Sequence, residues 1–171
     1  EGEVVTDETQ YDKGCGIPFA KRKSGWLFFH MDIGVEKSAD WGKTLLQYTE
    51  ASRSHVFELL GMESPKAPEK DEDRLHYTIL SQRERFARFV EKCSGIDDAA
   101  YRKEVANSSG GAQTFKPYGS CWLYENLAND YGLRDGLAHD VATKEVWRHC
   151  GYGAYWLGRG LGYMNSTHMN G

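Results

Sequence analysis

One cysteine stands where its surroundings could make it a nucleophile. Cys121 follows Gly119 and Ser120, and a serine before an apolar run commonly caps a helix. This pattern predicts a helix from Ser120 to about Tyr131, with Cys121 in its first turn. The unpaired backbone N–H groups and the dipole at a helix N-terminus favour the thiolate, which is the reactive form of cysteine. The same N–H groups could stabilise an oxyanion on an attacked carbonyl.

A histidine on a predicted strand could serve as the base. Residues 24–36 are dense in aromatic and branched side chains over the length of a strand. Because side chains alternate across a strand, His30 and Asp32 are expected on one face. His30 would then act as general base and acid, with Asp32 or His55 orienting its ring. Two residues along a strand span about 6.6 Å, which suits contact between His30 and Asp32 through water.

The remaining patterns predict the elements that would position these residues. A capping box, Ser81 to Glu84, starts a helix that ends before Gly95, and Cys93 is expected to be a buried small apolar residue on it. The expected fold class is α+β, with a small antiparallel sheet packed against helices. We expect one domain, residues 1–171, in which residues 1–14 are loosely held. We further expect a loop over 61–74, a strand over Leu75–Leu80, a loop over Asn107–Gln113, a helix over Asp140–Cys150, and a loop or edge hairpin in the glycine- and tyrosine-rich tail.

Composition narrows the classes of function. The 171 residues carry a net charge of -4 without a long basic block, which argues against nucleic acid as a partner. No apolar run is long enough to span a membrane, and residues 1–3 do not resemble a signal peptide. The sequence has no closely spaced set of metal ligands, so neither a metal nor another cofactor is expected. Sequons at Asn107 and Asn165 favour a secreted glycoprotein.

The order of these features resembles that of the circularly permuted papain-like (NlpC-like) cysteine hydrolases, which include the lecithin:retinol acyltransferase-like and PPPDE families. The segment His30-Met31-Asp32-Ile33-Gly34 is similar to their histidine strand, and Gly119-Ser120-Cys121-Trp122 to the segment that carries their nucleophile. The resemblance covers roughly residues 24–132. It departs from the family pattern at Ser120, where the families usually have Asn. It implies a permuted papain-like fold with Cys121 as nucleophile and His30 as base.

Two functions therefore remain open. The first is a cysteine hydrolase or acyltransferase that acts on a peptide, an isopeptide, a cell-wall amide or a lipid ester. The second is a secreted, non-enzymatic effector or binding domain in which all four cysteines form disulfides, with Cys121 joined to Cys150 or to another partner. The enzyme requires Cys121 as a thiol and the binding domain predicts no thiol at all, so counting thiols in the denatured, unreduced protein distinguishes them.

Overall fold

The computed structural model describes residues 2–32, 39–108, 111–125, 131–152 and 155–170. They form two compact units, described separately here. The first unit comprises residues 1–46 and 67–127, and the second comprises residues 47–66 and 128–171. Helix α2 (Ala39–Leu60) begins in the first unit and ends in the second.

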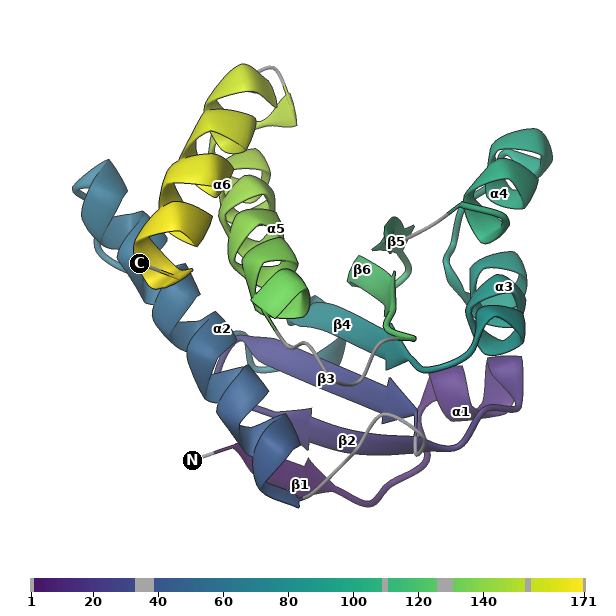
Figure 1. Cartoon of the computed structure of the whole chain (residues 1–171). Coiled ribbons are helices and arrows are strands. Elements are labelled where there is room, and N and C mark those ends of the chain that lie inside the picture. The colour runs from purple at the N-terminus through teal and green to yellow at the C-terminus, as the bar shows by residue number, and fades with distance from the viewer. Residues whose placement is uncertain (1, 33–38, 109–110, 126–130, 153–154, 171) are drawn as a thin grey trace. The chain divides into compact units, whose positions relative to one another are not determined.

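The first unit is built on a six-stranded sheet (Figure 1). The strand order is β1-β2-β3-β4-β6-β5. Neighbours β3, β4 and β6 run parallel, and the outer pairs are antiparallel. The predicted α+β class is thus confirmed, but the sheet is mixed and not antiparallel as predicted, because β3, β4 and β6 run parallel at its centre. The strands are β1 (Glu3–Val5), β2 (Phe19–Lys23), β3 (Leu27–Asp32), β4 (Leu75–Leu80), β5 (Gly111–Phe115) and β6 (Tyr118–Leu123).

Helices α1 (Gln10–Cys15) and α3 (Arg83–Cys93) contribute to the core of this unit, and α3 contacts both β4 and β6. Their Tyr11, Phe86, Phe89 and Val90 side chains join Leu80 and Cys121 of the sheet in one buried cluster. Burying large aromatic side chains removes a large apolar area from water, so this cluster is a main source of stability. Helix α4 (Ala99–Ala106) packs on α3, and a short 3₁₀ helix, η1 (Asp71–Asp73), precedes β4.

Several predicted elements have the expected type. The strand over Leu75–Leu80 and the centre of the 24–36 strand are confirmed, and residues 61–70 contain no helix or strand. The helix before Gly95 is also confirmed, but its capping box is wrong. The N-cap is Gln82, and the Ser81 hydroxyl donates to Asp32 instead.

Strand β5 occupies part of the loop expected over Asn107–Gln113. Residues 33–36 of the expected strand and 126–130 of the helix expected after Ser120 lie outside the described residues.

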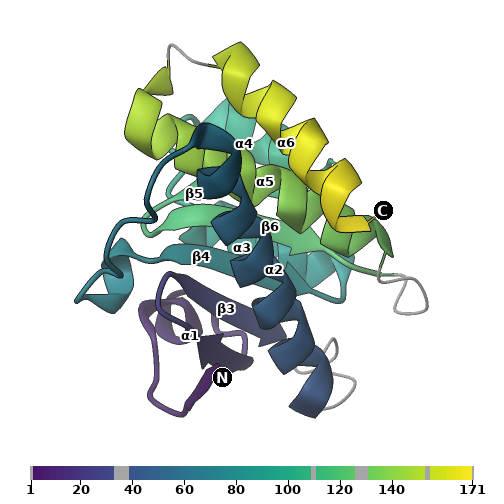
Figure 2. The same cartoon turned by 90° about the vertical axis from the view of Figure 1, so that its left-hand side faces the viewer.

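The second unit is helical, and its longest helices are α5 (Tyr131–Cys150) and α6 (Tyr155–Asn170), which lie side by side (Figures 1 and 2). The helix predicted over Asp140–Cys150 is confirmed and begins earlier. The prediction of a loop or hairpin for the tail is wrong, because residues 155–170 form α6, in which Gly158 and Gly162 face α5 and allow the two helices to pack closely. Arg53 of α2 and Glu145 of α5 form a buried ion pair at 3.1 Å.

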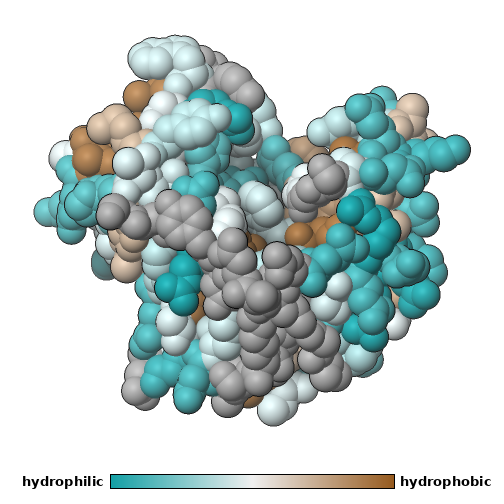
Figure 3. Space-filling model, in the orientation of Figure 1, coloured by the Kyte–Doolittle hydropathy of each residue, from teal (hydrophilic) through white to brown (hydrophobic). Residues whose placement is uncertain are grey.

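The surface seen in Figure 3 is mostly polar, with brown apolar areas in small patches. The largest apolar side chains of the sheet, such as Phe29 and Tyr77, are fully buried. Within the described residues, no helix has both the length and the apolar character needed to cross a membrane.

The packing of α6 predicts opposite effects for two equivalent substitutions. A β-carbon on Gly162 would lie 2.9 Å from the carbonyl oxygen of His139, whereas one on Gly160 would meet no atom within 4 Å. We expect Gly162→Ala to lower the free energy of unfolding by about 1–3 kcal/mol. Gly160→Ala should raise it by about 0.5–1 kcal/mol, because alanine is the better helix former. Urea denaturation measures both values. Equal effects of the two substitutions would contradict the close packing.

Candidate functional site

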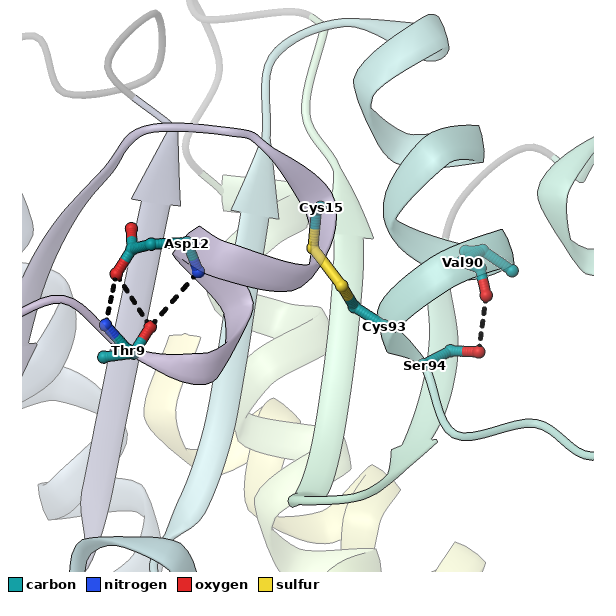
Figure 4. Close-up of a disulfide and its surroundings, with 6 residues drawn as sticks. All are labelled: Thr9, Asp12, Cys15, Val90, Cys93 and Ser94. Carbon is teal, nitrogen blue, oxygen red and sulfur yellow. Dashed lines mark hydrogen bonds between the residues drawn. A yellow bond between two sulfur atoms is a disulfide. The ribbon is translucent and has the colours of Figure 1, made fainter.

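The N-terminal segment, residues 1–14 of which we expect to be loosely held, contains strand β1 and most of helix α1. Strand β1 pairs with β2, and Thr9 and Asp12 form a reciprocal capping box at the start of α1 (Figure 4). The largely buried Lys21 donates to Asp12 at 2.6 Å. Burial by itself would raise the pKa of Asp12, but hydrogen bonds from Lys21 and Thr9 outweigh it and lower that pKa.

A disulfide between Cys15 and Cys93 joins the end of α1 to the end of α3 (Figure 4). Cys93 was expected to be a simple apolar residue and is instead half of this bond. The fully paired arrangement expected for the binding domain is also wrong, because Cys121 and Cys150 are thiols. A disulfide between residues that are 78 positions apart in the sequence restricts the unfolded chain strongly.

The structure overturns the reason for expecting Cys121 to be activated. Cys121 lies inside strand β6, paired with Thr78 of β4 and Ala112 of β5, and its side chain is fully buried in the apolar cluster. It therefore has no helix N-terminus to lower its pKa and no exposed surface from which to attack. The sequence pattern was misleading because Pro117 lies in the turn between β5 and β6, and Gly119 and Ser120 already belong to strand β6.

His30 and Cys121 share one face of the sheet but belong to strands that are not neighbours. His30 is in register with Thr78, and Thr78 with Cys121. Two strand spacings, about 9.6 Å, therefore separate their α-carbons. The Tyr11 ring packs edge-on against His30 at 4.9 Å, while its hydroxyl lies near Thr114 and Cys121. Tyr11 thus occupies the space on this face of the sheet through which Cys121 and His30 would have to meet. Burial raises the pKa of the Tyr11 hydroxyl.

The two residues considered as orienters have other partners. Asp32 is fully buried, accepts hydrogen bonds from the backbone and hydroxyl of Ser81, and forms an ion pair with Arg85 at 3.1 Å. These contacts tie the end of β3 to the start of α3, which is a structural role. His55 belongs to the second unit, where it lies 3.4 Å from Glu58 and stacks on His168.

His30 instead forms a buried pair with His76, a residue that the sequence did not single out. The Nε2 atom of His30 lies 3.0 Å from Nδ1 of His76, and Nε2 of His76 lies 2.8 Å from the carbonyl oxygen of Asp71. The Phe28 ring stacks on both imidazoles. The register that places His76 beside Phe28 is a tertiary property, so only the shared apolar strand setting of the two histidines could have suggested the pair.

The partners of these rings determine where their protons lie. Burial lowers the pKa of His76 to about 4, and burial together with nearby His76 and Lys21 lowers that of His30 well below its usual value. Both rings are therefore neutral at pH 7. A carbonyl only accepts, so His76 carries its proton on Nε2 and accepts at Nδ1 from the Nε2–H of His30.

A cavity of about 370 Å³ lies beside this pair. We call it the N-terminal pocket, because residues 3–10 form much of its wall. Its other lining residues are Lys23, Phe28, Asp71, Glu72 and His76. Small-molecule sites commonly have volumes from about 300 Å³ upward, so the N-terminal pocket is large enough for a ligand.

Comparison with known proteins identifies no relative: no family model, curated protein or solved structure matches the chain. Within the described residues, no group of three or more histidine, cysteine or acidic side chains is arranged to hold a metal ion. The residues and their geometry are therefore the basis for assigning a function.

The histidine pair predicts that stability falls with acidification. The unfolded chain binds more protons than the folded one between pH 6.5 and about 4, so the free energy of unfolding decreases as pH falls through this range. Between pH 7 and pH 5, His76 alone should account for about 2 kcal/mol, and His30 adds to it in the same direction. Urea denaturation of wild type and His76→Gln at both pH values measures the difference.

The control for this experiment is His168→Gln, which alters an exposed histidine of the second unit and should leave the pH dependence unchanged. Long-range ¹⁵N–¹H NMR spectra should also show the Nε2–H tautomer for both His30 and His76. A ring of either residue that titrates near pH 6.5 would rule out the buried neutral pair.

Proposed function

We propose that this chain is a non-catalytic, disulfide-stabilised binding domain of a secreted protein, and that its ligand site is the N-terminal pocket. The observation that carries this proposal is the burial of the two residues best suited to covalent catalysis. Cys121 has no exposed surface and His30 is 1 % exposed, whereas a nucleophile and its base must reach the substrate. The N-terminal pocket, in contrast, is a cavity of ligand size with buried polar and aromatic groups in its wall.

The disulfide supports both the proposed ligand site and the proposed secretion of the protein. It fixes the end of α1, and the segment that leads into α1 forms the wall of the N-terminal pocket. A wall fixed in this way lowers the entropy that is lost when a ligand binds. Disulfides persist in oxidising compartments and are rare in the cytosol, which favours secretion.

The two sequons differ in their accessibility. The Asn165 side chain is fully buried and donates a hydrogen bond to the carbonyl of Ala138 at 2.7 Å, so it cannot carry a glycan in the folded protein. Asn107 is exposed just after α4 and is open to modification. A glycoprotein of this sequence would therefore carry its glycan at Asn107.

Thiol labelling tests the non-catalytic assignment. Iodoacetamide should modify the exposed Cys150 of the folded protein and leave Cys121 unmodified, because the reagent cannot reach a thiol inside the core. After unfolding in guanidinium chloride without a reductant, both residues should react. Mass spectrometry of the peptides locates each modification and identifies the Cys15–Cys93 disulfide.

The matched controls are Cys150→Ser, which should abolish labelling of the folded protein, and Cys121→Ser, which should leave it unchanged. Faster labelling of Cys121 than of Cys150 at pH 6 in the folded protein would overturn the proposal, and a cysteine hydrolase would then be the better assignment.

A further inference from the structure

The Cys15–Cys93 disulfide lies beside a second cavity of the first unit, of about 220 Å³. We call it the cystine cavity, because Cys93 forms part of its wall, together with Gly14 of α1. Cys93 is 8 % exposed and Cys15 is 3 % exposed. A β-carbon on Gly14 would lie 3.0 Å from Cys93 Sγ, so the glycine leaves this side of the sulfur uncovered. A small molecule in the cystine cavity therefore reaches Cys93 more readily than Cys15.

The cystine cavity has a positive lining. Lys92 in the last turn of α3 and Lys116 in the turn between β5 and β6 are both exposed and both line it. Among the described residues that form its wall, none carries a carboxylate. Two ammonium groups attract an anion to the cavity and favour thiolates over thiols. Because a thiol attacks a disulfide as its thiolate, these lysines favour reduction of the bond by an anionic thiol.

The two helices that the disulfide joins differ in what else holds them (Figure 4). Helix α3 has eleven residues, four of them buried, and Ser94 closes its end by donating to the carbonyl oxygen of Val90 at 2.6 Å. Helix α1 has six residues and contains Gly14, so it is too short and too weak a helix former to persist alone. Breaking the disulfide therefore frees the end of α1 and leaves α3 in place.

We propose that the Cys15–Cys93 disulfide is a redox switch, which a small anionic thiol of the glutathione class reduces from the cystine cavity. Reduction opens α1, and residues 3–10 lose the anchor that shapes the wall of the N-terminal pocket. The inference rests on the proposed binding function, because the N-terminal pocket is the proposed ligand site. The domain would then hold its ligand in an oxidising compartment and release it where thiols are abundant.

The reaction consists of two exchange steps. The thiolate of the reductant attacks Cys93 Sγ, the bond between the two cysteines breaks, and Cys15 leaves as a thiolate. A second reductant thiolate attacks the reductant sulfur of this mixed disulfide and releases the Cys93 thiolate. The two reductant molecules, now joined by a disulfide, have supplied two electrons, and their two protons end on Cys15 and Cys93.

The rate of reduction tests the role of the cystine cavity. Glutathione, an anion, and cysteamine, a cation, are each added in excess at pH 7 to the folded Cys150→Ser chain, which lacks the exposed thiol. Samples are alkylated at intervals and analysed by mass spectrometry. The double change Lys92→Gln and Lys116→Gln should slow reduction by glutathione about fivefold and should not slow reduction by cysteamine. The first mixed disulfide should carry glutathione on Cys93.

The matched control is the double change Lys70→Gln and Lys103→Gln, which removes the same charge from exposed lysines that do not line the cystine cavity. It should leave both rates unchanged. Equal slowing of glutathione by the two double variants, or a first mixed disulfide on Cys15, would overturn attack from the cystine cavity and with it the switch.

Hydrogen exchange tests the opening of α1. In the reduced Cys150→Ser chain, amides of residues 3–15 should exchange at least about tenfold faster than in the oxidised chain, whereas those of β3, β4 and β6 should keep their protection. The further change Cys15→Ser removes the disulfide without a reductant and should give the same pattern. Measurements on the reduced chain with native cysteines at 15 and 93 decide the question if that variant does not fold.

The results separate the switch from the proposed function. Unchanged exchange of residues 3–15 after reduction, or exchange that rises equally throughout the first unit, would overturn the switch and leave the binding domain in place. Preferential labelling of Cys121 in the oxidised, folded protein would overturn the proposed function instead, and the release of α1 would stand without it.

Discussion

The position of Tyr11 over the sheet is the constraint on which the rest of the first unit depends. Its ring packs edge-on against His30 and Phe89 and covers the face on which Cys121 also lies. Helix α1, which carries it, has only six residues and would not be stable alone. It is held by the Thr9 capping box at one end and by the Cys15–Cys93 disulfide at the other. Fixing this short helix both closes the core and anchors residues 3–10, which form much of the wall of the N-terminal pocket.

Burial changes the chemistry available to side chains that look reactive in the sequence. An exposed histidine at neutral pH exchanges protons readily, but the His30 and His76 rings are held neutral by the cost of placing charge in an apolar environment. Their hydrogen bonds run in one direction, from His30 to His76 to the Asp71 carbonyl. The pair therefore acts as a polar but uncharged structural element between the core and the pocket.

The fate of the cysteines follows from the same packing. Cys15 and Cys93 are distant in the sequence, and the packing of α1 on α3 brings their sulfur atoms together. Cys121 lies in the apolar cluster between β4 and β5, where it behaves as a small apolar residue. Cys121 thus has the buried apolar role that was expected for Cys93, whereas Cys93 forms a structural disulfide.

Local sequence patterns were sufficient to predict those helices and strands whose type is set by the periodicity of their own apolar residues. The periodicity of Phe86, Phe89 and Val90 predicted helix α3, the run Leu75–Leu80 predicted a strand, and the mixture of elements predicted the α+β class. Tertiary contacts decided the rest. Helix α6 forms despite its glycines because Gly158 and Gly162 allow it to pack closely on α5. Ser120 and Cys121 join a strand because β4 and β5 offer hydrogen bonds on both sides. The His30–His76 pair, the disulfide and the N-terminal pocket join residues far apart in the chain, and strand register and helix packing, which one sequence does not specify, bring them together.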